Sequence, residues 1–583
     1  MAQTPVADRL YLARLLAREA RTRARASLAR VTGLASRLRL RSPDRLLLVP
    51  PDIRTADPTL ANDIYGGFFV FAGKMVNTHG VMPFEVDPPS AAWLAGLAGF
   101  GWLRHLRAAD TALARANARS LLTDWLAVAD QGRNVAHWEP RVVARRLLSF
   151  ISQSPLLLEG VDGAFYRRFM KSLGRHATAL QGALRRGLEG EDRILALVAL
   201  AQLGLCAEGL DKMQRRATRL LASELTRQFL PDGGHISRDP RAIVDLLLDL
   251  LPLRHAYAAR GLAAPTELLN AIDRMLPMLR LFRLGDGSLA LFNGMGVTSP
   301  HHLTTALSHD DARAAALLDA PYSGYQRLEG DDVCLVMDTG APPPPAFSGH
   351  AHAGCLSFEF TAQGLRLVVN CGAPALANAD MRAAARSTAA HSTLVVADTS
   401  SCGFATGAGL SRWIEGRVIR GPRDVRVLRQ EHAGHVELIA SHDGYARNFG
   451  LVHQRAISLS RDGRVLRGED RLTPEVGETP SARPYAIRFH MHPATRVSTT
   501  GDDRVVAIAL ANGVRWLFRA SAPVQIEESI YFASVDRPRG ADQIVIHANA
   551  SDAPSVEWSF ERLSAGDGFD VAGPETDQAL SSP

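Results

Sequence analysis

The sequence is poor in lysine and in cysteine. Lys74, Lys171 and Lys212 are the only lysines among 583 residues, so arginine carries nearly all the positive charge of a chain whose net charge is +6. The planar arginine fork suits carboxylate and sulfate ligands, although a GC-rich genome would give the same composition. The five cysteines form no CxxC pair. This excludes a small disulfide framework and predicts free, mostly buried thiols.

Long apolar runs are also missing. No run reaches the roughly 18–20 residues that a membrane-spanning helix needs. The first residues, MAQTPVADRLYLARLLAREARTRARASLARV, carry arginines throughout and lack the apolar centre of a secretory signal. We therefore expect a cytoplasmic or membrane-peripheral protein with no integral membrane span. Residues 1–45 are predicted to form a basic helical arm, either solvated or lying on a membrane surface. No helix-turn-helix, zinc-finger or RNP-type pattern is present, so no nucleic-acid partner is expected.

The remaining chain divides into two parts with different apolar periods. In residues 46–320, segments such as ILALVALAQLGLCAEGL and TELLNAIDRMLPMLRLF repeat apolar residues at i, i+3, i+4 and i+7. Short breaks rich in Gly, Pro and Asp separate these segments, as in LPDGGHISRDP. Many helices joined by short loops predict an antiparallel helical bundle or an (α/α) toroid.

In residues 325–563 the apolar period drops to two. LSFEF and LRLVVN alternate around a short turn, and RAISLSRDGRVLRGEDRL does the same around a DG turn. These segments predict a large antiparallel sheet assembly, a sandwich or stacked sheets. The expected fold class is therefore α+β, with the helical domain first. The polar, acidic residues 564–583 are predicted to be a disordered tail.

The stretch FSGHAHAGCLSFEF holds two histidines, His350 and His352, two residues apart. In an extended segment both would point to the same face. Asn370 ends the next hairpin, and His391 precedes another strand, so the four side chains could converge. Two histidines and an oxygen ligand would suit Zn²⁺. The spacing alone also allows each histidine simply to satisfy local backbone groups.

Taken together, the motifs HAHAGCLSFEF, GLRLVVNCG, RSTAAHSTLVV, HDGYARNFGLVHQR, GEDRL, IRFHMHP and RQFLPDGGHISRDP resemble the heparinase II/III-like family of polysaccharide lyases. The resemblance covers about residues 46–560. It implies an N-terminal (α/α) toroid, a C-terminal antiparallel β-domain and β-elimination on a uronate-containing polysaccharide. In that reaction the weakly acidic proton on C5 is removed, so the enzyme must neutralise the neighbouring carboxylate and supply a base and an acid.

The resemblance assigns roles to the histidine motif. His350 matches the family's catalytic histidine, whereas His352 and His391 match zinc ligands. Asn370 stands where the family has an aspartate ligand, so zinc coordination here would be weaker.

The helical half departs from the family pattern. Glu191 and Asp192 occupy the places of the usual Asn-His pair, and Arg241 with Ala242 replaces the usual Tyr-His pair. The remaining candidates for the base are His350 and His235. Tyr257 is a third, although its place in the sequence favours a core or groove aromatic. Candidate substrate-binding residues are Arg238, Arg241, Arg386, Glu191, Asp192 and Trp138, the last of which could instead be a hydrophobic staple.

Three functions are compatible with these residues. The first is a divergent lyase that acts on a glycosaminoglycan-like or alginate-like polymer. The second is a catalytically silent polysaccharide-binding relative. The third, a hydrolase using Glu191 and Asp192, is disfavoured because neighbouring residues on a helix diverge by about 100°. A homodimer is left open. Although relatives are often periplasmic, the lack of a signal favours an internal substrate.

Overall fold

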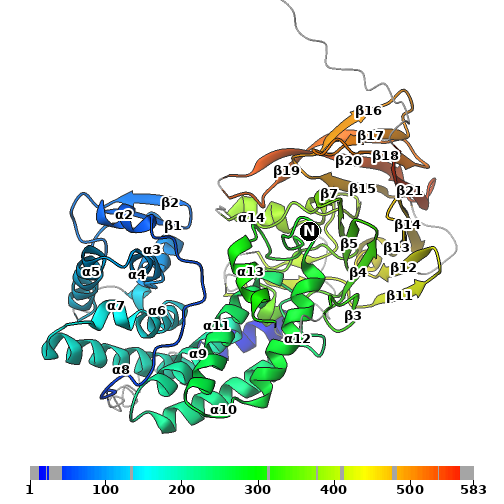
Figure 1. Cartoon of the computed structure of the whole chain (residues 1–583). Helices are drawn as coiled ribbons and strands as arrows, with labels where there is room; N and C mark the ends of the chain where they lie inside the picture. The colour runs from blue at the N-terminus through cyan, green and yellow to red at the C-terminus, as the bar shows by residue number, and fades with distance from the viewer. Residues whose placement is uncertain are drawn as a thin grey trace, which may run out of the picture.

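The computed structural model describes residues 12–21, 23–24, 42–130, 135–310, 315–375, 379–406, 413–475, 482–535 and 537–564. Most of the predicted arm and nearly all of the predicted tail lie outside these residues. A helical N-terminal part is followed by antiparallel β-sheets, which confirms the α+β fold class (Figure 1). Within the described ranges, every helix is too short or too polar to cross a membrane.

The helical domain contains α-helices of five to 23 residues joined by short loops. Its helices are α2 (Leu60–Tyr65), α3 (Ala91–Ala98), α4 (Leu103–Ala109), α5 (Ala112–Asp130), α6 (Pro140–Ser152), α7 (Ser154–Leu158), α8 (Gly163–Arg185), α9 (Gly190–Cys206), α10 (Asp211–Gln228), α11 (Pro240–Ala259), α12 (Thr266–Phe282) and α13 (Pro300–Ser308). A small hairpin of β1 (Phe68–Phe71) and β2 (Lys74–Asn77) and the 3₁₀ turn η2 (Val135–Trp138) complete it.

Local sequence signals explain where these helices begin and how they pack. Asp162 caps α8 by accepting a hydrogen bond from the Phe165 N–H, and Asp239 caps α11 in the same way. Every residue of α9 from Ile194 to Cys206 is buried. A helix that is apolar all round belongs in the centre of a domain, and α9 packs against α6, α8, α10 and α11.

The C-terminal domain contains two antiparallel sheets. The nine-stranded sheet has the order β19-β20-β15-β7-β6-β5-β4-β3, with β8 also paired to β15, and the eight-stranded sheet has the order β11-β12-β13-β14-β21-β18-β17-β16. The strands are β3 (Asp319–Ala320), β4 (Tyr325–Gly330), β5 (Val333–Asp338), β6 (Phe358–Ala362), β7 (Leu365–Val369), β8 (Leu394–Val396), β11 (Val425–Glu431), β12 (His435–His442), β13 (Leu451–Ser460), β14 (Val465–Pro474), β15 (Pro484–Met491), β16 (Arg496–Thr499), β17 (Val505–Ala509), β18 (Arg515–Ala520), β19 (Gln525–Tyr531), β20 (Arg539–Asn549) and β21 (Ser555–Arg562).

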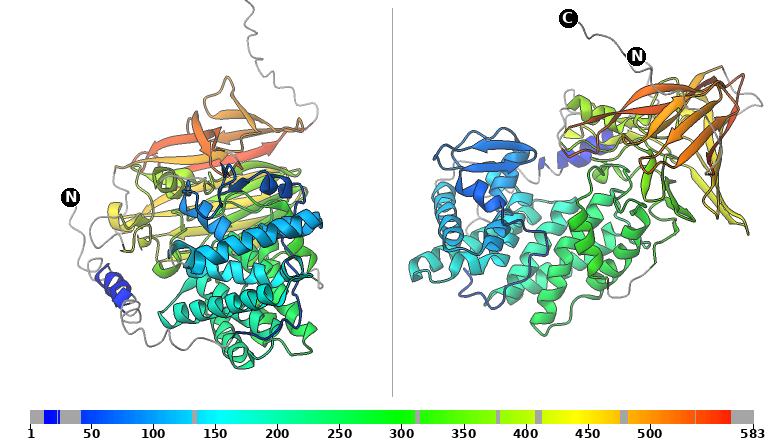
Figure 2. Two further views of the ribbon diagram at one scale, coloured as in Figure 1. Left: turned by 90° about the vertical axis from the view of Figure 1, so that its left-hand side faces the viewer. Right: turned by 45° about the horizontal axis from the view of Figure 1, so that its top comes forward.

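Short elements fill the connections of this domain. They are the 3₁₀ turns η3 (Pro345–Phe347) and η4 (Thr388–Ala390), the helices α14 (Ala379–Arg386) and α15 (Ala446–Phe449), and the small pair β9 (Gly403–Phe404) and β10 (Val418–Arg420). The two views of Figure 2 show the sheets layered at one end of the molecule and the helices at the other.

The two sheets form a sandwich because each strand turns alternate residues inward. Strand β13 alternates buried and half-buried residues along its whole length. Phe358 and Phe489 of one sheet pack with Trp558 and Phe560 of the other. The opposite face of the nine-stranded sheet packs on the helices, since Tyr325 belongs to the helical core cluster. This arrangement confirms the expected sandwich.

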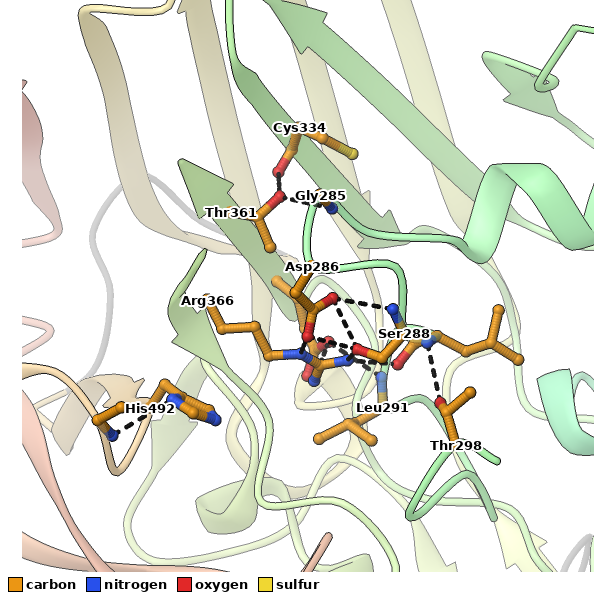
Figure 3. A network of polar contacts seen from close by, with 12 residues as sticks. Gly285, Asp286, Ser288, Leu291, Thr298, Cys334, Thr361, Arg366 and His492 are labelled. Atoms are coloured by element: carbon orange, nitrogen blue, oxygen red, sulfur yellow. Dashed lines mark hydrogen bonds and ion pairs between the residues drawn. The ribbon is translucent and has the colours of Figure 1, made fainter. Parts of the chain in front are cut away.

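A polar network fixes the junction of the two domains (Figure 3). Arg366 of β7 donates to Asp286 Oδ2 at 2.9 Å and to the Leu289 carbonyl at 2.7 Å, both in the loop that follows α12. Buried Glu359 of β6 accepts from the Leu291 N–H at 3.0 Å. The β-domain is therefore held in a defined position on the helices, which matters because the candidate site lies between them.

Candidate functional site

The segment with the two histidines follows η3 and is positioned by residues distant in sequence. Arg386 donates from Nε to the Ala351 carbonyl at 2.7 Å and from Nη2 to the Ser348 carbonyl at 3.1 Å. Asn293, from the helical domain, accepts from the His352 N–H at 3.1 Å. The two imidazoles are placed differently, because His350 is exposed and His352 is buried.

Asp239 lies next to His350 at the domain junction. A Cβ built on Gly294 would fall 2.7 Å from the His350 Cβ and 2.4 Å from Asp239 Oδ2. Glycine is therefore required at position 294, and its lack of a side chain allows the carboxylate and the histidine to approach. Burial raises the pKa of Asp239, while the charges of Arg241 and His350 oppose that rise. The structure thus places an exposed histidine beside a buried carboxyl group.

Glu191, at the start of α9, faces the same region. Burial, reinforced by repulsion from Asp239, raises its pKa to about 7. Its protonation state therefore changes in the neutral pH range. A protonated carboxyl group donates a hydrogen bond and does not repel an anion.

Arg141 and Arg241 bring positive charge to this region. Arg141 of α6 contacts Asp192 at 2.9 Å and Glu191 at 3.8 Å. Arg241, in the first turn of α11, is exposed and lies close enough to Asp239 to lower the pKa of that carboxyl group. We call His350, Asp239, Glu191, Arg141 and Arg241 the junction cluster.

The three predicted metal ligands lie close together on the β-domain. His391 donates from Nδ1 to the Ser387 carbonyl at 2.7 Å, so its Nε2 accepts from His352 Nδ1 at 3.1 Å. Burial lowers the pKa of His391 to about 4 and that of His352 as well, so both are neutral. Asn370 accepts through Oδ1 from the Ser392 N–H at 3.0 Å, and its buried Nδ2 has no partner.

This arrangement does not fit a three-ligand zinc site. The candidate nitrogens of His352 and His391 bond to each other, the Asn370 oxygen already accepts a backbone hydrogen bond, and the group contains no carboxylate. Among the residues that the structure describes, no group of three His, Cys, Asp or Glu side chains is arranged to hold a metal ion.

Arg238 was predicted to bind substrate, but its guanidinium is surrounded by acceptors of the protein itself. Its guanidinium donates to the carbonyls of Ser323, Gly324, Gly340 and Ala341 and to Asp338 Oδ1, at 2.6–3.1 Å. These five bonds use all five N–H groups of an arginine. Arg238 therefore joins the helical domain to the start of the β-domain and has no donor left for a substrate.

His235 and Tyr257 are also occupied by protein partners. His235 is buried, with Nδ1 2.7 Å from Ser237 Oγ and Nε2 3.2 Å from Gln228 Oε1, and burial lowers its pKa to about 3. The buried Tyr257 hydroxyl bonds to Thr218 and accepts from Gln214 Nε2 at 3.2 Å. Burial raises the pKa of Tyr257. Both side chains therefore lack a free polar atom with which to remove a substrate proton.

Trp138 and Arg386 have structural surroundings too. The Trp138 ring lies 5.5 Å from the His176 ring and 6.3 Å from the Trp125 ring, with the Arg146 guanidinium 5.4 Å from its centre. Arg386, half-buried, bonds to the backbone carbonyls of Ala351 and Ser348 and lies over the Phe404 ring. Arg386 therefore positions the segment with the two histidines.

The structure adds four residues that the sequence did not single out: Arg141, Asp239, Asn293 and Gly294. Asp239 and Gly294 bring the helical domain to His350, and Asn293 fixes the backbone of His352 while donating to the Tyr325 hydroxyl at 2.8 Å. The Asp-Pro pair in SRDPR signals the helix start that places Asp239. The sequence has no signal for the pairing of Gly294 with His350, because they come from different domains.

The chain thus combines a helical domain with an antiparallel sandwich, and His350 lies exposed at their junction. Residues 312–559 match the family model "Heparinase II/III-like, C-terminal". FtsZ-localized protein C from Caulobacter vibrioides (strain NA1000 / CB15N) is 34% identical over 545 residues, which cover 90% of this chain and 92% of that protein. The chain belongs to the heparinase II/III-like family.

Solved structures show the same fold at low sequence identity. A crystal structure of heparinase III is 14% identical, with a TM-score of 0.68 and coverage of 93% of this chain and 89% of that one. A mutant of heparan sulfate lyase HepC from Pedobacter heparinus is 13% identical, with a TM-score of 0.62 and coverage of 93% and 88%. These likenesses establish the fold and leave the activity to be argued from the junction cluster.

Proposed function

We propose that the protein is a lyase that cleaves a uronate-containing polysaccharide or oligosaccharide by β-elimination at the junction cluster. The observation that carries the proposal is the exposed His350 beside Asp239, with Arg241 exposed next to them. Asp239 lies close enough for its charge to interact with the His350 imidazole, and an exposed imidazole can take a proton from a bound substrate. His350 is then the base that takes the C5 proton.

The other members of the cluster stabilise the anionic intermediate. Arg241 neutralises the substrate carboxylate, as a guanidinium fork does well. Protonated Glu191 supplies a neutral hydrogen-bond donor at the place of the family's Asn-His pair. The electron pair from the broken C5–H bond forms the C4–C5 double bond as the C4–O bond breaks. The leaving oxygen then takes from His350 the proton that His350 removed from C5.

The alternative is a catalytically silent relative that binds a polysaccharide on the same fold. It is favoured by one observation: the protein that is 34% identical to this chain is named for its localisation with FtsZ, not for a reaction. A role of that kind needs a binding surface and no proton transfer.

A panel of uronate polymers, including a glycosaminoglycan and an alginate, tests the proposal. β-Elimination gives an unsaturated uronate that absorbs in the near ultraviolet, and we expect that signal with at least one polymer. New reducing ends without the absorbance would mean hydrolysis and would contradict the proposal. Binding with neither signal would establish the silent alternative.

A further inference from the structure

The eight-stranded sheet packs its inner face into the sandwich and turns its outer face away from the helices (Figure 1). A hollow of about 490 Å³ lies on this outer face and is lined by residues of β12, β13, β14, β18 and β21 and by Ser521, which follows β18. Three further lining residues have small side chains: Ala456, Ser458 and Ser559. The face is therefore open, and long side chains of a partner can enter the hollow.

The charged side chains around the hollow are separated by sign into two rows that cross the strands. In one row, Ser559 of β21 lies opposite Arg467 of β14 on one side and opposite Arg519 of β18 on the other. In the other row, Glu469 of β14 lies directly opposite Glu557 of β21. We call Arg467 and Arg519 the basic row and Glu469 and Glu557 the acidic row. The two rows are two residues apart along each strand, or about 7 Å.

Two of these four charges have partners within the chain. Glu469 pairs with Arg471 at 2.6 Å, and Arg519 lies 3.7 Å from Glu561. Both pairs are with residues outside the two rows and are partly exposed, so each contributes little to stability. Neither pair prevents the side chain from meeting a further charge across the face.

The other two charges are not paired. Arg467 and Glu557 are exposed, and neither has an ion-pair partner within the ranges that the structure describes. Neighbouring strands gain stability from opposite charges across from each other and lose it from like charges, yet Glu557 faces Glu469 directly. The separation by sign therefore costs the single chain stability, and a partner with the reverse pattern would offset that cost.

We propose that this face binds the same face of a second copy of the chain. A two-fold axis that runs between the rows and parallel to them turns the basic row of one copy onto the acidic row of the other. Arg467 then meets Glu469 of the second copy, and Glu557 lies between Arg467 and Arg519 of the second copy. Packed sheets lie about 10 Å apart, a gap that an arginine and a glutamate side chain bridge together.

The size of the face determines the strength of this dimer. The rows cross four strands, so the paired area is about 20 Å by 25 Å, or roughly 500 Å² per copy. Stable interfaces bury about 800 Å² per partner, so the dimer should be weak and should depend on its charges. No member of the junction cluster lies on the eight-stranded sheet. The dimer therefore leaves both junction clusters open and is independent of whether the protein is a lyase or a silent relative.

Sedimentation velocity of the full chain at low salt, from about 1 to 200 µM, tests the dimer. We expect a monomer–dimer equilibrium with a Kd of roughly 1–100 µM. Raising the salt to about 0.5 M should raise the Kd by about tenfold or more, because salt screens exposed charges. A chain that stays monomeric at every concentration would overturn the proposal and would leave the face to a different partner.

Charge-reversed chains locate the contact. An acidic chain carries Arg467→Glu with Arg519→Glu, and a basic chain carries Glu469→Arg with Glu557→Arg. Each should stay monomeric by itself because its two rows then have the same sign and repel those of a second copy. An equimolar mixture of the two chains should form a heterodimer, because every row then faces a row of opposite sign.

A control separates this contact from a general effect of net charge. Arg215→Glu with Arg219→Glu, on the exposed side of α10, changes the net charge as much as the acidic chain does and should dimerise like the wild type. Melting curves check that every variant folds. Dimers of wild-type strength in either charge-reversed chain alone, or failure of the mixture to associate, would overturn the assignment.

Discussion

At the scale of single residues, the chemistry depends on burial and hydrogen bonding, which differ among otherwise similar side chains. His350 is exposed beside a carboxyl group, whereas His352, His391 and His235 are buried and engaged with protein atoms. Burial penalises the charged form of an imidazole and lowers its pKa. Of the four histidines, only His350 is available for proton transfer with a substrate.

Glu191 should determine the alkaline limb of the activity. Because its pKa is raised to about 7, wild-type activity should fall as pH rises through 7 and the side chain ionises next to the anionic substrate. Glu191→Gln keeps a donor without the charge, so kcat/KM should persist up to about pH 9. Rates measured from pH 5 to about 9 in wild type and variant check this. An unchanged alkaline limb in the variant would contradict the role of Glu191.

The same substitution should affect stability in a defined pH window. A carboxyl group whose pKa rises on folding costs stability as pH increases from its unfolded pKa of 4.5 to about 7. Above that window the cost is complete, so Glu191→Gln should be more stable than wild type at pH 8 by about 1–3 kcal/mol. Urea unfolding at pH 5 and at pH 8 measures the difference, which should be several times smaller at the lower pH.

The zinc prediction has an equally direct test at this scale. Protein purified without chelator should contain no stoichiometric zinc, because His352 and His391 bond to each other and Asn370 supplies no carboxylate. Asn370→Asp restores the ligand type of the family and should raise the zinc content. One zinc per wild-type chain in elemental analysis would show that the three residues rearrange to bind the metal.

At the scale of elements, buried arginines join segments that are far apart in the chain. Arg455 of β13 pairs with Asp470 of β14 at 2.8 Å through two separate N–H groups, and donates to the carbonyls of Leu356 and Ser392. Ser392 follows His391 directly. Arg455 thus connects the eight-stranded sheet to the backbone beside the buried histidine pair.

Loss of this arginine should be costly. Arg455→Met removes the guanidinium that contributes most to holding the pKa of Asp470 well below its usual range, and it leaves a buried carboxyl group without its charged partner. We expect a loss of about 3–5 kcal/mol in the free energy of unfolding. Arg471→Met, on β14 next to Asp470, is the control, because its exposed pair with Glu469 should contribute less than about 1 kcal/mol. Equal effects in urea unfolding would contradict the account.

The helices and strands could be predicted from the sequence, but some of their packing could not. The apolar periods predicted helices followed by alternating strands, because periodicity is a local property of the chain. The packing of the helix at residues 12–21 was not predicted: Leu12, Leu15 and Leu16 pack with Ala405, Ile414 and Ile419 of the β-domain. The basic composition suggested a solvated arm. The leucines nevertheless give this segment an apolar side, and residues of the β-domain cover it.

At the scale of the whole molecule, the site exists only when the two domains are in place. Asp239, Glu191 and Gly294 come from the helical domain and His350 from the β-domain. No local pattern reports such a pairing. The sequence likewise could not show that Arg238 uses all its N–H donors in hydrogen bonds at the domain junction, because their acceptors lie 85 to 103 residues away in the chain. A closed toroid remains a prediction.

The central claim is that His350 removes the C5 proton of a bound uronate. It is tested most directly by the near-ultraviolet absorbance of the unsaturated product, followed with the polymer that the panel selects. His350→Ala should lower kcat by about 10²–10⁴ and leave the melting temperature unchanged, while His547→Ala, an exposed histidine on β20, should match wild type. Full activity in His350→Ala would contradict the account.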